Sequence, residues 1–171
     1  MPNTIKIKKY VDIIEEYEAN AAIMPGMLIE LMSTGKVRAH ATAQGNALPM
    51  FALEDELQGK SIDDAYAAAD RVQCWVPVRG EQVYAILADG ESVSIGDSLE
   101  SNGDGYLRKH VADTGAWEGS EAGSLTVYPN PIVGIALEAV DLSASSGASG
   151  ESSGTVGGVL GYNDRIKIRI L

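Results

Sequence analysis

The stretch RVQCWVPVRGEQVYAILADGESVSI occupies residues 71–95. It contains two runs rich in valine, isoleucine and aromatic side chains, at 72–78 and 82–88, which are joined at Arg79-Gly80. Runs of this composition between turn-forming residues predict β-strands. Asp89-Gly90 is typical of a tight turn and leads into a further short strand at 92–95. The stretch therefore predicts a fold built from short β-strands.

The same pattern extends along the chain. Residues 27–32 and 36–42 flank Ser33-Thr34-Gly35 and predict a hairpin, and residues 106–111, 132–140 and 165–171 predict further strands. Ser61 has an acid three residues later, which predicts one or two helical turns over 62–69. Short strands at this spacing predict a mainly β protein with a small β-barrel or sandwich domain.

Met24-Pro25-Gly26 breaks this pattern near the start of the chain. We expect residues 1–25 to form an extended N-terminal arm and residues 26–171 to form the β domain. Within the arm, Ile5-Lys6-Ile7-Lys8 alternates like a half-buried strand, and the stretch from Val11 to Tyr17 fits either a helical or an extended conformation. Residues 143–161 are rich in serine and glycine, which predicts a flexible loop.

The composition limits the classes of protein that the chain can belong to. With 171 residues, 45% of them hydrophobic, the chain can bury one core without crosslinks. Its one cysteine, Cys74, excludes a disulfide framework and a multi-cysteine metal site. No apolar run is long enough for a membrane span, and the N-terminus does not have the pattern of a signal peptide. We expect synthesis in a reducing cytoplasm and no membrane partner.

The charge is distributed unevenly. The net charge is −11, yet residues 1–9 and 165–171 each carry three basic residues and no acid. An acidic body between two basic ends repels phosphate, so we expect no nucleic-acid partner. Two interpretations of the basic ends remain open. They either attract an acidic partner, or they lie on the solvent face of two strands and protect a sheet edge.

No motif in the sequence amounts to an active site. Residues 150–154 match G-x-S-x-G but lie inside the Ser/Gly tract, without the strand and helix that a nucleophile elbow needs. His40 and His110 are expected on half-exposed strand faces, and with Cys74 they are too few for a zinc site. Cys74 is expected to be a packed thiol. We predict no enzymatic activity, no cofactor and no metal.

Several segments resemble the capsid cement, or head decoration, proteins of tailed bacteriophages. The resemblance covers most of residues 25–143 and the final strand. Its strongest parts are ALEDELQGK at 52–60, VYAILADG at 83–90 and Gly96-Asp97-x-Leu99. The resemblance implies a structural protein on the outer surface of the phage head that clamps neighbouring major capsid subunits after expansion. It also implies a homotrimer on the capsid.

The arm is the expected attachment element, because an alternating strand can add to a sheet edge of another chain and its lysines can meet an acidic surface. The residues expected at the capsid interface are Ile5, Lys6, Ile7, Lys8, Tyr10, Ile13 and Ile14.

An alternative is a lipoyl-like carrier or accessory β domain of an enzyme complex. That function requires a lysine at an exposed hairpin tip, and the candidates are Lys36, Lys60 and Lys109.

Overall fold

The computed structural model describes residues 2–112, 130–143 and 165–171. These residues form short β-strands and one turn of 3-10 helix, with no α-helix among them. The elements, in chain order, are β1 (Lys6–Lys8), β2 (Ile14–Ala19), β3 (Ile29–Leu31), β4 (Lys36–Ala39), β5 (Phe51–Ala52), η1 (Glu56–Gln58), β6 (Arg71–Trp75), β7 (Gln82–Ile86), β8 (Ser92–Val93), β9 (Ser98–Ser101), β10 (Leu107–Lys109), β11 (Ile132–Ala136), β12 (Val140–Asp141) and β13 (Arg165–Ile170).

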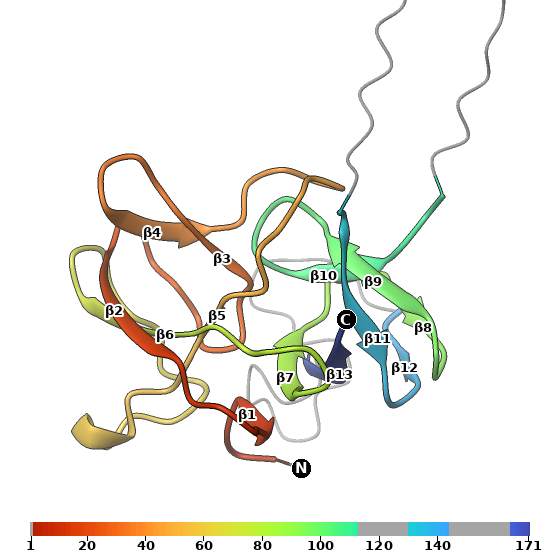
Figure 1. Ribbon diagram of the computed structural model, residues 1–171, viewed down its shortest axis with the longest axis horizontal. Coiled ribbons are helices and arrows are strands. Elements are labelled where there is room, and N and C mark those ends of the chain that lie inside the picture. Colours follow the sequence, from red (N-terminus) through yellow and green to blue (C-terminus); the bar gives the residue numbers. More distant parts are fainter. Residues whose placement is uncertain (1, 113–129, 144–164) are drawn as a thin grey trace, which may run out of the picture.

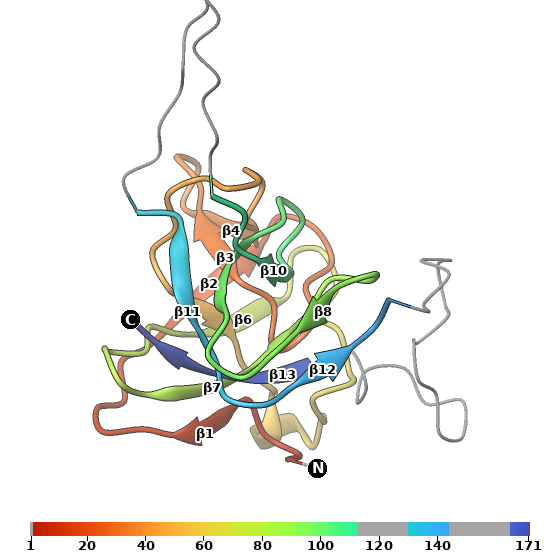
Figure 2. The same cartoon turned by 90° about the vertical axis from the view of Figure 1, so that its right-hand side faces the viewer.

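The larger sheet has six strands in the order β1-β7-β13-β11-β9-β10, and all of its neighbours are antiparallel. The last strand of the chain, β13, therefore lies inside the sheet and pairs with β7 and β11. Ile166, Ile168 and Ile170 of β13 are all buried in the core. The first strand, β1, forms one edge of this sheet and lies next to β7 (Figure 2).

The second sheet has five strands in the order β3-β4-β2-β6-β5, in which β2 and β4 are parallel. Its two ends curl toward each other. The Ile29 N–H donates to the Met50 carbonyl at 2.9 Å, and the Ala52 N–H donates to the Met27 carbonyl at 3.1 Å. These bonds join the β3 and β5 ends without a continuous ladder, so the sheet is strongly curved but not closed. A separate two-stranded sheet pairs β8 with β12.

The two larger sheets lie side by side (Figure 1). The strands at 72–78 and 82–88 therefore exist as expected, as β6 and β7, but they belong to different sheets. Gly26 helps to join the sheets, because its N–H donates to the Ala52 carbonyl and its carbonyl accepts from the Ile86 N–H. Its φ of +92° favours glycine, and a Cβ there would lie 3.1 Å from the Tyr84 carbonyl oxygen.

The mainly β prediction is confirmed, and a small sandwich-like domain describes the arrangement better than a barrel, because no sheet closes. The hairpin predicted around Gly35 is also confirmed as the antiparallel pair β3–β4. The stretch after β1 is extended rather than helical, and it forms β2.

The prediction of a separate N-terminal arm is wrong for the segments that form β1 and β2. β1 is paired with β7, β2 lies inside the five-stranded sheet, and Ile5 is fully buried in the main core. Alternation indicated a strand correctly, but the break at Pro25-Gly26 is a crossing between sheets rather than a domain boundary.

Two further predictions concern the segment at 62–69 and the Ser/Gly tract. The helical turns predicted over 62–69 are not formed; the Asp64 carboxylate accepts the Ser61 N–H and Oγ–H, as at a helix start, but the chain continues in turns. The short helix is η1 instead. The predicted Ser/Gly loop, apart from Ser143, and the G-x-S-x-G match within it lie outside the described residues.

Candidate interaction surface

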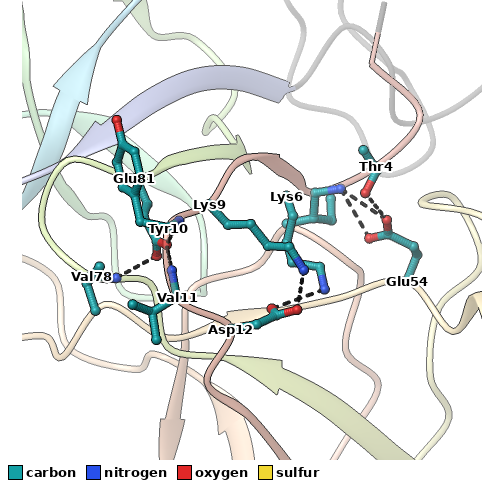
Figure 3. A network of polar contacts seen from close by, with 10 residues as sticks. Thr4, Lys6, Lys9, Tyr10, Val11, Asp12, Glu54, Val78 and Glu81 are labelled. Carbon is teal, nitrogen blue, oxygen red and sulfur yellow. Dashed lines mark hydrogen bonds and ion pairs between the residues drawn. The ribbon is translucent and has the colours of Figure 1, made fainter.

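Two buried carboxylates hold the N-terminal segment against the rest of the protein (Figure 3). Glu81 lies just before β7 and accepts backbone N–H bonds from Val11 at 2.8 Å and from Val78 at 2.7 Å, together with one from Tyr10. A carboxylate that accepts several backbone N–H groups forms strong charge-assisted bonds. Glu81 therefore fixes the backbone between β1 and β2 onto the turn before β7.

Glu54 performs the same task at the start of the segment. Its carboxylate accepts the Ile5 N–H at 3.1 Å and the Thr4 hydroxyl. This contact positions Ile5 so that its side chain enters the core. The segment is thus fixed on both sides of β1.

Asp12 joins the exposed lysines of the same segment. Its carboxylate lies 3.4 Å from the Lys6 Nζ and also accepts a bond from Lys9 (Figure 3). The hydrogen bond from Lys9, aided by the charge of Lys6, lowers the pKa of Asp12 below its ordinary value. Two of the three lysines of the basic N-terminus are therefore paired within the chain.

The anchored backbone presents apolar side chains to solvent. Tyr10 is 64% exposed and Val11 is 50% exposed, and Ile13 and Ile14 are also exposed. The Lys8 amine lies 5.3 Å from the centre of the Tyr10 ring, within range of a cation–π contact. We call Tyr10, Val11, Ile13 and Ile14 the apolar strip.

The seven interface residues expected from the sequence fall into three groups. Tyr10, Ile13 and Ile14 belong to the apolar strip, and Lys6, Ile7 and Lys8 are half-buried or exposed on β1. Ile5 is buried and unavailable to a partner in this structure. Val11 was missed, although it lies in the same exposed run.

An apolar groove of about 460 Å³ begins beside Ile13. It lies within the curve of the five-stranded sheet and includes Leu31, which is 53% exposed, and Leu48, which is 69% exposed. Its lining residues are Ile13, Glu15, Tyr17, Ile29, Glu30, Leu31, His40, Asn46, Leu48, Met50 and Val76. The sequence analysis missed this groove, because it forms only when the two ends of the sheet come together.

At the base of the groove, His40 lies between a serine and a glutamate. Its Nδ1 is 2.8 Å from the Ser101 Oγ, and its Nε2 is 3.1 Å from the Asn46 carbonyl oxygen and 3.8 Å from a Glu30 carboxylate oxygen. Ser101 is fully buried, and its Oγ also accepts the Gly103 N–H at 3.2 Å. A buried hydroxyl held in this way is placed to stabilise the turn rather than to attack a substrate. His40 is buried, which corrects the expectation of a half-exposed face.

His110 is only partly buried, which agrees better with the expectation of a half-exposed face. Its Nδ1 lies 2.5 Å from the carboxylate of Glu100, a buried residue of β9 that also binds the Arg108 Nε at 2.9 Å. The three side chains satisfy a buried charge and join β9 to β10 and the residue after it.

Cys74 is fully buried, and burial raises the pKa of its thiol to about 12. The prediction of a packed thiol is confirmed. Among the described residues, no group of three or more histidine, cysteine, aspartate or glutamate side chains is arranged to hold a metal ion. No helix in this part of the chain has the length and hydropathy of a membrane span.

The three lysines considered for a carrier function all have neighbours within the chain. Lys36 begins β4 and pairs with Glu18, and Lys109 ends β10 and lies 2.7 Å from Asp97. The Lys60 amine lies 5.6 Å from the centre of the Tyr66 ring.

No protein-family model matches the sequence, and no curated protein matches it. Among solved structures, the chain is similar to the N base of the head fiber gp8.5 of bacteriophage phi29. The TM-score is 0.49 at 13% identity, and the alignment covers 94% of this chain and 95% of that one. A likeness of this size leaves the function of the present chain open.

Proposed function

We propose that this protein is a structural component of a tailed-phage virion, which binds the outer surface of the head. It stabilises the expanded capsid by joining neighbouring major capsid subunits. The observation that carries the proposal is the apolar strip, an exposed set of large side chains on a backbone held by the buried Glu81. Exposed apolar side chains gathered in one place are typical of interaction sites.

The sequence supports the same function. The segments that resemble cement proteins form the end of β5 with η1, most of β7 and the turn into β9, so they belong to the body of the domain. The resemblance also implies a homotrimer at three-fold positions of the capsid. No heptad pattern is available, so we expect contacts between β domains to hold the trimer together.

In this proposal the strip, rather than a detached arm, makes the capsid contact. Tyr10, Ile13 and Ile14 supply apolar area, and Lys6 and Lys8 lie beside them on β1. Ile5 has a different role, because it holds β1 to the core. Burying a large apolar side chain contributes about 1.5–3 kcal/mol before the costs of association.

The test is binding to undecorated expanded capsids, measured by co-sedimentation. We expect stoichiometric binding by the wild type, and binding about 100-fold weaker for the double variant Tyr10→Ser with Ile13→Ser. The matched control is Ile95→Ser, which removes an exposed isoleucine from the turn before β9. Failure of the wild type to bind, or equal binding by all three proteins, would contradict the proposal.

A further inference from the structure

The two sides of β2 are paired differently. On one side, Ile14 to Glu18 are matched with Trp75 to Arg71 of β6. On the other side, β4 meets β2 only at Glu18 and Ala19. The first half of β2 therefore has a neighbouring strand on one side only.

The direction of the backbone groups follows from the hydrogen bonds at both ends of β2. The Ile13 carbonyl accepts the Val76 N–H at 3.0 Å, and the Ala19 N–H donates to the Asp70 carbonyl at 2.8 Å. The backbone N–H and C=O groups of the odd-numbered residues of β2 thus point toward β6. The Asn20 N–H donates to the Val37 carbonyl at 2.8 Å, so even-numbered residues face the other way.

Ile14 and Glu16 consequently direct their N–H and C=O groups toward the side that β4 does not reach. Neither has a backbone partner there among the described residues, and both residues are exposed. An unpaired row of this kind is a template for another strand. We call Ile14, Glu15 and Glu16 the open edge.

The apolar groove lies next to the open edge. β2 contributes Glu15 and Tyr17 to its lining, Ile13 precedes β2, and β3 contributes Ile29 and Leu31. A strand added to the open edge would lie beside β2 where the pairing with β4 ends, and every second side chain would share the face of β2 on which Glu15 and Tyr17 line the groove. Backbone bonds and side-chain pockets together are how peptides are recognised by strand addition.

The charges around the groove indicate what the added strand carries. Glu15 and Glu30 line the groove, and Glu16 is exposed on the open edge. Glu30 is paired with Arg38 at 2.7 Å, whereas Glu15 accepts only the Tyr17 hydroxyl and Glu16 has no side-chain partner in the described part of the chain. Two carboxylates thus remain without a cation, and that of Glu16 lies on the face of β2 opposite the groove.

We propose that the open edge receives an extended segment of another protein, with apolar side chains toward the groove and basic side chains on its other face. The inference rests on the proposed function for the identity of that protein, which would be the major capsid protein. The binding chemistry itself is independent of that identity and can be tested with a peptide.

The probe is a nine-residue peptide of alternating valine and lysine, blocked at both ends, added to the full chain. We expect amide hydrogen exchange, followed by NMR, to slow at least tenfold at Ile14 and Glu16. The amides of Glu15 and Tyr17, which already face β6, should change little. Unchanged exchange at Ile14 and Glu16 at millimolar peptide would overturn the proposal.

Two N-methylated forms of the peptide separate strand addition from simple apolar binding. One is methylated at its odd amides and the other at its even amides, so that only one loses the bonds to β2. We expect one form to lose at least tenfold in affinity and the other to keep most of its binding. Equal binding by both forms would overturn strand addition.

Protein variants test the two faces of the added strand. Leu48→Asp in the groove and Glu16→Lys on the open edge should each weaken the binding of the unmethylated peptide at least fivefold. The control Ile95→Asp should leave that binding unchanged. Protection of Ile14 and Glu16 in the free protein would also overturn the proposal. If that protection rises with protein concentration, the occupant is a second copy, and if it does not, the occupant is the chain itself.

The outcomes for the peptide and the capsid are separable. A peptide that protects the open edge, with no binding to capsids, would contradict the proposed function alone. Capsid binding that is unaffected by Glu16→Lys and Leu48→Asp would contradict the major capsid protein as the occupant of the open edge, and would leave the proposed function standing.

Discussion

β1 and β13 have nearly the same sequence pattern and very different positions. Both alternate isoleucine with lysine or arginine, as Ile5-Lys6-Ile7-Lys8 and as Arg165–Ile170. β13 has a strand on each side and buries all three isoleucines, whereas β1 forms a sheet edge, where Ile5 is buried just before the strand but Ile7 within it is only partly buried. The alternating pattern therefore predicts which face of a strand is apolar, but the number of neighbouring strands decides how much of that face is buried.

The basic side chains of the two strands differ in the same way. Arg165 is buried at the start of β13, where its guanidinium binds the Asp63 carboxylate at 2.9 Å and the Pro25 carbonyl at 3.2 Å. The lysines of β1 remain at the surface of an edge strand, as the edge-protection interpretation expects. That interpretation is wrong for β13, which is not an edge. The same residue class thus connects two parts of the fold in one strand and faces solvent in the other.

The largest effect is expected on deleting residues 1–20. The deletion removes β1, the buried Ile5 and β2, which separates β4 from β6. We expect the cooperative thermal unfolding transition, followed by circular dichroism, to disappear. A truncated chain that still unfolds cooperatively would show that this segment is dispensable for the domain, and the contrast with β13 would be wrong.

A matched pair of substitutions compares the two strands directly. Ile168→Ala should lower the free energy of unfolding by about 2–5 kcal/mol, because it leaves a cavity in the core. Ile7→Ala should cost about 1 kcal/mol, because the side chain is only partly buried at an edge. Urea denaturation measures both values, and equal losses would remove the distinction between the strands.

The attachment of the N-terminal segment can be tested at Glu81. Glu81→Gln keeps one acceptor oxygen but removes the charge that holds Tyr10, Val11 and Val78, and it should cost about 1–3 kcal/mol. Amide exchange at Tyr10 and Val11 should accelerate. Glu54→Gln is the matched change at the other anchor, where exchange should accelerate at Ile5 instead. Unchanged exchange in both variants would show that the carboxylates do not hold the segment.

The smallest effect is expected at Asp12. Asp12→Asn removes the pairs with Lys6 and Lys9, which as exposed ion pairs contribute about 0.2–1 kcal/mol. Because folding lowers the pKa of Asp12, its contribution is present above the unfolded pKa and is lost as the pH falls through the lowered value. The difference from the wild type, measured by urea denaturation, should be largest at neutral pH and shrink on acidification. A difference that grows toward low pH would contradict this pairing.

The sequence alone predicts the mainly β class, the positions of most strands, and the alternation that separates core-facing from solvent-facing side chains. It also determined that Tyr10, Ile13 and Ile14 are apolar residues in a charged segment. These features follow from local chemistry, because strand propensity, side-chain alternation and turn residues act over a few residues.

The folded structure was needed to show which strands lie inside a sheet, that β6 and β7 belong to different sheets, and that the N-terminal segment is part of the domain. It also decided where the groove and the open edge lie. The physical reason is that strand pairing joins residues far apart in the chain, such as β1 with β7 and β2 with β6. Identical alternating patterns can occupy an edge or an interior position, and the difference depends on which distant strands are left to pair.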